Sequence, residues 1–88
     1  MNLRWSEQAC RQLAEIYRYI ALDKPEAARS VIEKIINAAE RLLLHPAMGR
    51  PGRVTGTSEL IHPPFVIVYA QDGDVLDIRS VLHGRQRR

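Results

Sequence analysis

Two stretches in the first half of the chain place apolar residues at every third or fourth position. The first begins at Glu7, and its apolar positions are Ala9, Leu13, Ile16, Tyr17 and Ile20. The second carries a longer apolar stripe, made of Ala28, Val31, Ile32, Ile35, Ile36, Ala39, Leu42 and Leu43. Because an α-helix brings such positions to one face, the pattern predicts two amphipathic helices.

The residues at the ends of these stretches suggest where each helix starts and stops. Ser6 suits the N-cap of the first helix, because its hydroxyl can accept a bond from a free backbone N–H. Pro25 disfavours helical geometry at the residue before it and itself suits a first turn, so the first helix ends near Asp23 and the second starts there. Pro46 ends the second helix. This short corner predicts an antiparallel helical hairpin.

The second half of the chain changes to extended segments. Residues 45–56 are rich in proline and glycine, which predicts an irregular but ordered connection. Three candidate strands follow, at Thr57 to His62, Phe65 to Ala70 and Val75 to His83, and Asn2 to Trp5 is a further short candidate. The Asp72-Gly73 pair predicts a hairpin turn between the last two.

Alternation along the last candidate strand predicts which side chains share a face. Leu76, Ile78 and Leu82 fall on one face of a regular strand, and Asp77, Arg79 and His83 fall on the other. We therefore expect one polar face of the sheet to be free for binding. The complete pattern predicts an α+β protein with one domain over residues 1–88, in which the N-terminal helical hairpin packs on a small antiparallel sheet of three to four strands.

The basic residues are unevenly placed along the chain. The net charge is +3, and residues 79–88 contain four arginines, Arg79, Arg85, Arg87 and Arg88, and no acidic residue. Such a segment is typical of a chain that binds a nucleic acid or an acidic protein surface. On charge alone, a solvated chain end explains the segment equally well.

Several classes of protein have little support in the sequence. Cys10 is the only cysteine, so neither an intramolecular disulfide nor a cysteine metal cluster can form. The sequence has no glycine-rich phosphate loop, no metal-ligand spacing and no nucleophile triad. No apolar run is long enough to cross a bilayer, and the N-terminus does not look like a signal peptide. We therefore expect a cytoplasmic protein that uses no cofactor, metal, membrane or small-molecule substrate.

Four segments, in order and with the spacing of a known family, resemble the RelE/ParE superfamily of toxins, and the ParE-like branch in particular. They are Leu44–Gly52, Gly56–Leu60, Ile67–Tyr69 and the closing Val81–Gln86. The resemblance implies the toxin of a type II toxin–antitoxin system, neutralised by a cognate antitoxin that is ParD-like or similar. ParE-like members inhibit DNA gyrase without being catalysts, whereas RelE-like members cleave mRNA on the ribosome. The family usually has arginine where this chain has Ser58.

The two modes of action need different residues. An endoribonuclease needs a base, an acid and cations that converge on one face, and the candidates are Glu59, Arg79 and His83. The predicted strands contain no lysine, and Ser58 replaces a family arginine, so we favour the gyrase inhibitor and expect no catalytic residue. Its expected target-binding residues are Arg79, His83, Arg85, Arg87 and Arg88, with Arg50 and Arg53 as accessory positions.

Simpler roles remain open for the same side chains. His83 can hydrogen-bond neighbouring backbone at the end of its strand. Glu59 can form an ion pair with Arg50 or Arg79.

Overall fold

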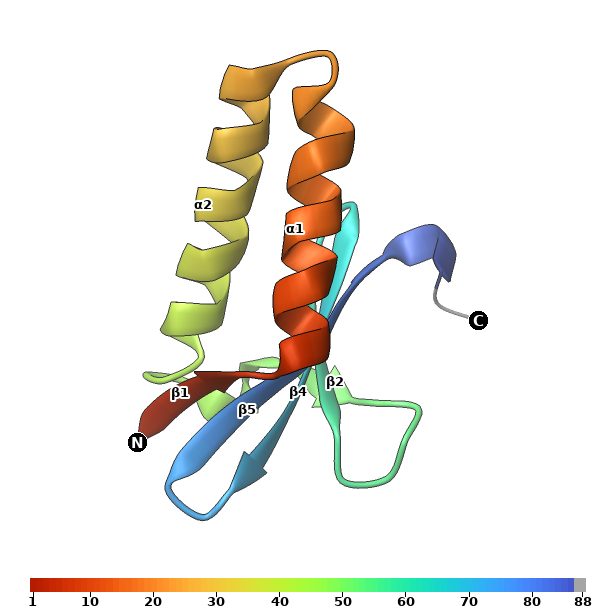
Figure 1. Cartoon of the computed structure of the whole chain (residues 1–88). Helices are drawn as coiled ribbons and strands as arrows, with labels where there is room; N and C mark the ends of the chain where they lie inside the picture. The colour runs from red at the N-terminus through yellow and green to blue at the C-terminus, as the bar shows by residue number, and fades with distance from the viewer. Residues whose placement is uncertain (87–88) are drawn as a thin grey trace.

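Five strands form one sheet in the computed structural model, which describes residues 1–86 (Figure 1). Their order across the sheet is β1-β5-β4-β3-β2. They are β1 (Asn2–Trp5), β2 (Arg50–Pro51), β3 (Ser58–His62), β4 (Phe65–Asp72) and β5 (Val75–His83).

The α+β class is confirmed, but the sheet is larger and less regular than expected. Neighbouring strands are antiparallel except β1, which pairs parallel with β5. The predicted sheet of three to four antiparallel strands therefore had too few strands and no parallel pair. The strand β2 was not predicted, because it has only two residues and shows no alternation. The partner of β1 lies more than seventy residues along the chain, as in the pair of Arg4 with Asp77, so local pattern does not reveal its direction.

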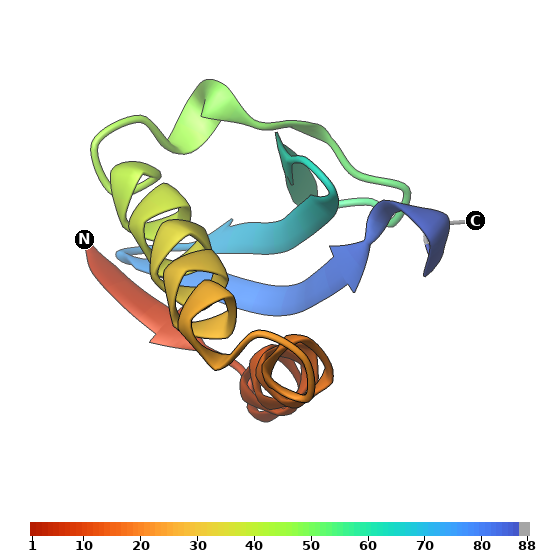
Figure 2. The same cartoon turned by 90° about the horizontal axis from the view of Figure 1, so that it is seen from above.

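The helical hairpin and its corner at Pro25 are confirmed, but the second helix ends at Arg41 in a turn, before Pro46, which was predicted to end it. Helix α1 spans Glu7–Ala21, and the N–H of Ala9 donates to the Ser6 hydroxyl at 3.0 Å, as expected for an N-cap. Helix α2 spans Pro25–Arg41 and has its proline in the first turn. Figures 1 and 2 show both helices on the same side of the sheet.

The core lies between the helices and this face of the sheet. Ile35 of α2 and Leu42, which follows its last residue, are fully buried, as are Leu76 and Ile78 of β5. Each large aliphatic side chain buried in this way stabilises the folded protein by about 1.5–3 kcal/mol relative to exposure in water. Helix α1 lies against β5, where β1 has ended, and the Gln12 Oε1 accepts a bond from the Val81 N–H at 2.7 Å.

The connection between α2 and β3 is held by one tyrosine of the sheet. The Tyr69 hydroxyl donates to the carbonyl oxygen of Pro46 at 2.8 Å and accepts from the N–H of Gly49 at 3.0 Å. A Cβ added at Gly49 would lie 2.4 Å from that hydroxyl oxygen, so only glycine fits here. The glycine and proline residues of this segment therefore build an ordered path, as predicted.

A β-bulge divides β5. Val68 of β4 is opposite Ser80 and Tyr69 is opposite Ile78, so Arg79 has no partner residue on β4. One extra residue reverses the alternation beyond it. Val81 is buried in the core at 2% exposure, and His83, two residues further along β5, lies on the same face of the sheet. The prediction that Arg79 lies on the face of Asp77 is in agreement with their ion pair, whereas the predicted faces of His83 and Leu82, which lie beyond the bulge, were wrong.

Candidate functional site

The end of β5 is fixed by local contacts around His83. Its imidazole packs edge-on against the Phe65 ring, with centroids 5.9 Å apart and planes at 83°. The His83 Nδ1 accepts a hydrogen bond from the backbone N–H of Arg85 at 3.2 Å, and the N–H of Gly84 donates to the carbonyl of Pro64 at 2.7 Å. The simpler role expected for His83, a bond to neighbouring backbone, is confirmed.

Beyond His83 the chain forms a short 3-10 helix, Gly84–Gln86, and Arg85 is exposed to solvent. Arg87 and Arg88, which the sequence also places in the target-binding set, lie outside the described residues. The described part of the basic segment thus presents Arg85 beside a histidine whose position is set by Phe65.

Arg79 is turned toward an acidic neighbour on the sheet face that points away from the helices. Its Nε lies 3.6 Å from Asp77 Oδ2. Arg4 of β1 reaches the same carboxylate with Nε at 3.2 Å from Oδ1 and Nη2 at 3.4 Å from Oδ2. The backbone of the bulge is held as well, because the Ser6 hydroxyl donates to the Arg79 carbonyl at 2.9 Å. Arg4, Asp77 and Ser6 had not been selected from the sequence.

Glu59 forms the ion pair that the sequence allowed. Its Oε1 lies 3.7 Å from Arg50 Nη2, and the two residues are opposite each other in the β2–β3 pairing. The Glu59 side chain is 4% exposed, whereas that of Arg50 is 53% exposed. Arg53 lies in the exposed loop between β2 and β3. Ser58, at the position of the family arginine, lies partly buried opposite Tyr69.

The three endoribonuclease candidates do not converge. Glu59 is paired with Val68, which alternates with core residues of β4, so its side chain points away from the helices. His83 points toward them. Arg79 shares the face of Glu59, but β4 lies between their strands, and two strand spacings amount to about 10 Å. The arrangement does not bring a base, an acid and a cation to one phosphodiester.

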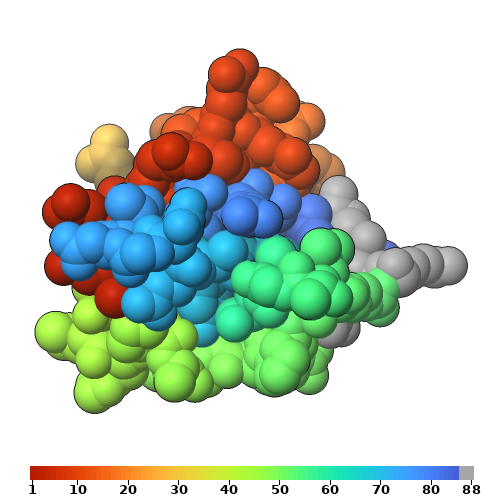
Figure 3. Space-filling model, turned by 90° about the horizontal axis from the view of Figure 1, so that it is seen from below, coloured from red at the N-terminus to blue at the C-terminus, as the bar shows by residue number. Residues whose placement is uncertain are grey.

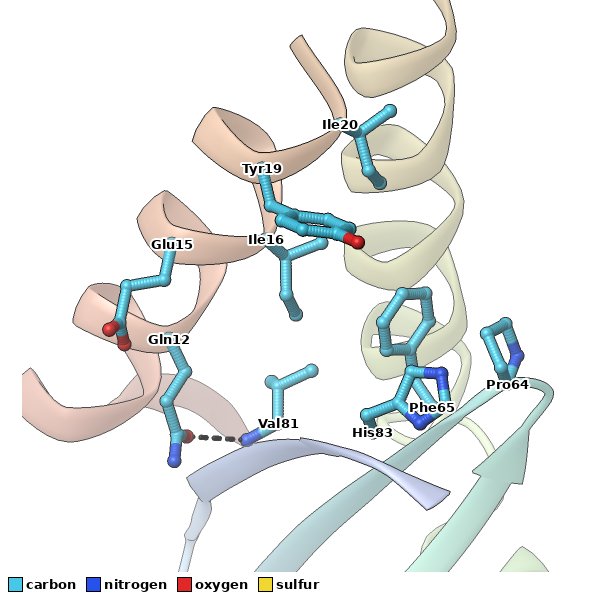
Figure 4. Close-up of a pocket in the computed structure, with 9 residues that line it drawn as sticks. All are labelled: Gln12, Glu15, Ile16, Tyr19, Ile20, Pro64, Phe65, Val81 and His83. Carbon is cyan, nitrogen blue, oxygen red and sulfur yellow. Dashed lines mark hydrogen bonds between the residues drawn. The ribbon is translucent and has the colours of Figure 1, made fainter. Parts of the chain in front are cut away.

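A groove lies between α1 and the end of β5, and its volume is about 400 Å³ (Figure 4). Figure 4 shows α1 side chains on one side and residues of β5 and the β3–β4 turn on the other. Tyr19 at its rim is 80% exposed. The groove is lined by Gln12, Glu15, Ile16, Tyr19, Ile20, Pro64, Phe65, Val81 and His83. The sequence marked Ile16 and Ile20 as apolar helix positions but not His83, because the bulge that turns it inward was not expected.

Within residues 1–86, no three histidine, cysteine, aspartate or glutamate side chains are grouped as a metal site. No helix in that range has the length and apolar character needed to cross a membrane.

Comparison with known proteins gives consistent results. Residues 3–88 match the family model described as ParE toxin of type II toxin-antitoxin system, parDE. The Sinorhizobium fredii protein named "Putative toxin Y4kP" is 41% identical, and the match covers 98% of this chain and 91% of that protein.

Solved structures show the same fold. The chromosomal ParDE system of P. aeruginosa matches with a TM-score of 0.87 at 25% identity, covering 94% of this chain and 95% of that one. The RelBE2 toxin–antitoxin complex of Mycobacterium tuberculosis matches with a TM-score of 0.62 at 22% identity, covering 93% and 95% of the two chains.

Proposed function

Because the chain belongs to the ParE toxin family of type II toxin–antitoxin systems, we propose that it inhibits DNA gyrase in the cytoplasm and so arrests growth. It does so as a binding protein rather than as an enzyme. The observation that carries this proposal is the separation of Glu59, Arg79 and His83, because these three residues do not form one catalytic set. Inhibition by binding needs only a complementary surface.

The proposed target-binding surface is the segment that follows the bulge. Arg79 and Arg85 are exposed, and His83 borders the groove. Arg87 and Arg88 extend the same basic segment in the sequence. Arg50 lies on the edge strand β2 and Arg53 in the loop after it; they are accessory positions, and Arg50 is already paired with Glu59. Exposed cations of this kind contribute to the rate and specificity of association more than to its strength.

A direct test compares the two targets of the superfamily. Purified toxin, freed from its antitoxin, is added to DNA gyrase in supercoiling and cleavage assays, and to ribosomes programmed with mRNA. We expect gyrase inhibition and intact mRNA. Cleaved mRNA with unaffected gyrase would overturn the proposal and return Glu59, Arg79 and His83 to a catalytic role.

We further propose that the cognate antitoxin, ParD-like or similar, places an apolar helix face in the groove between α1 and β5. The groove floor is apolar, with Ile16, Phe65 and Val81, and the exposed Tyr19 ring stands at its rim. An amphipathic helix in a groove is a common way for a flexible partner to bind and fold. Because His83 also lines the groove, an occupant would lie next to the target-binding segment.

Replacement of Tyr19 tests the position of the antitoxin. Tyr19→Ala should weaken antitoxin binding by about 2 kcal/mol or more, as for a central aromatic contact. Tyr17→Ala is the matched control, since Tyr17 is also exposed, at 41%, but does not line the groove. Isothermal titration calorimetry measures both. Equal losses for the two variants would place the antitoxin elsewhere.

A further inference from the structure

Two arginines share one carboxylate on the face of the sheet that points away from the helices. Asp77 lies opposite Arg4 of β1 in the register, and Arg79 follows it on β5. One carboxylate neutralises one guanidinium, so the group of three carries a net charge of +1. Figure 3 shows this side of the molecule, with β1 in red beside β5 in blue. The neighbouring Asp74 adds no free negative charge, because it is paired with the N-terminal ammonium at 3.4 Å.

The carboxylate lies beneath the two cations. The Asp77 side chain is 13% exposed, whereas those of Arg4 and Arg79 are 70% and 51% exposed. An approaching molecule therefore meets the guanidinium groups first. Arg4 contacts the Asp77 carboxylate through its Nε and Nη2. Arg79 contacts the same carboxylate through its Nε, which is its one ion pair within residues 1–86. Of the five N–H donors on each guanidinium, most remain available to a further acceptor.

The spacing of the two groups suits a single anion. Arg4 Nη2 is 3.4 Å and Arg79 Nε is 3.6 Å from the same oxygen, Asp77 Oδ2, so these nitrogens are at most the sum of both, 7.0 Å, apart. A phosphate group can bridge such a span through two oxygens, with charge-assisted bonds of about 2.8 Å on each side.

The backbone under this cluster is fixed by the N-terminus of α1. The N–H of Ser6 donates to the Ile78 carbonyl at 2.9 Å, and the Ser6 hydroxyl donates to the Arg79 carbonyl at 2.9 Å. Arg79 is the extra residue of the bulge, and its side chain lies on the outer surface beside Asp77. The two arginines are thus held in place before any ligand binds.

We propose that Arg4 and Arg79, held by Asp77, bind the phosphodiester backbone of a nucleic acid. A polyanion with regularly repeated charges fits better than a single acidic group, because a further exposed cation, Arg85, follows directly after β5. This proposal goes beyond gyrase inhibition, since it concerns the chain's own affinity for nucleic acid and does not depend on which enzyme is the target.

The salt dependence of DNA binding tests the proposal. A fluorescently labelled DNA duplex is titrated with antitoxin-free full-length toxin at several salt concentrations, and anisotropy gives the affinity. Removing one phosphate contact should reduce the slope of log affinity against log salt by about 0.9, so we expect this reduction for Arg4→Gln and for Arg79→Gln. Arg11→Gln is the matched control, because Arg11 has its own acidic partner, Glu7, at 3.1 Å. A slope that falls equally for all three variants, or no DNA binding by the full chain, would overturn the proposal.

Two more variants separate a built site from charge alone. Arg4→Lys keeps the charge but loses the planar fork, so the salt slope should be retained while affinity falls several-fold. Asp77→Asn adds one unit of positive charge yet releases both arginines, and we expect weaker binding. Tighter binding by Asp77→Asn would contradict the role of Asp77 in positioning the arginines. Thermal unfolding of each variant, together with circular dichroism at the assay temperature, ensures that only folded protein is compared.

Discussion

The two halves of β5 differ in what lies beside them. From Val75 to Ile78 the strand has β4 on one side and β1 on the other, and Leu76 and Ile78 are fully buried. From Ser80 to His83 it keeps β4, but the place of β1 is taken by α1, whose Gln12 side chain bonds to the backbone of the strand. Beyond that bond the groove opens. One strand thus serves the core in its first half and a binding surface in its second.

The bulge at Arg79 is what separates these halves. It reverses the faces of the later side chains, and it thereby brings His83 to the groove. Replacement of the buried Leu76 or Ile78 in the first half should therefore lower stability, whereas replacement of His83, which borders the groove in the second half, should lower binding more than stability. Single replacements in the two halves, compared by their effect on the free energy of unfolding, test this difference.

Leu76→Ala in the first half should destabilise the protein most. The side chain is fully buried in the core, and a leucine-to-alanine change in such a place costs about 2–5 kcal/mol. Urea unfolding followed by circular dichroism measures this. The fully buried Ile35 of α2 provides a comparison, since its replacement by alanine should cost a similar amount. A loss below about 1 kcal/mol at both positions would contradict the core described here.

Ser6→Ala should have an intermediate effect, because Ser6 joins α1 to the bulge. The hydroxyl caps α1 and also bonds the Arg79 carbonyl, and loss of an N-cap typically costs about 0.5–2 kcal/mol. Ser6→Asp should restore much of the cap but not the bond to Arg79, since a carboxylate cannot donate. Thermal unfolding of both variants separates the two contributions. An unchanged melting temperature for Ser6→Ala would show that neither bond matters to stability.

His83→Ala should have the smallest effect on stability and a large effect on gyrase. Its edge-to-face contact with Phe65 is worth about 0.5–1.5 kcal/mol, and the bond from the Arg85 N–H lies near the surface. We expect a small decrease in melting temperature and at least a tenfold weaker inhibition of supercoiling. If the variant unfolds as readily as Leu76→Ala, the division of β5 into two halves is wrong.

Most of the fold could be predicted from the sequence because its patterns are local. Helix periodicity, the cap at Ser6 and the corner at Pro25 each involve neighbouring residues, and all three occur in the structure. The parallel pairing of β1 and the two-residue β2 could not be predicted. Both depend on contacts between distant segments, and neither leaves a repeating pattern.

The candidate site was only partly predictable for the same reason. The pairing of Glu59 with Arg50 and the backbone bond of His83 follow from residue type and position. The face of His83 was predicted wrongly because regular alternation was assumed. The step of three from Ile78 to Val81 marks the bulge, but Leu82, one residue further, fits the regular pattern equally well.

We propose that this toxin inhibits gyrase through the basic segment after the bulge. The most direct measurement compares the full chain with a chain that ends at Gly84, and so lacks Arg85, Arg87 and Arg88, in a gyrase supercoiling assay. Antitoxin binding and melting temperature are measured in parallel. We predict that the full chain inhibits gyrase, while the shortened chain does not inhibit but still binds antitoxin and unfolds at nearly the same temperature. Equal inhibition by both chains would contradict this account.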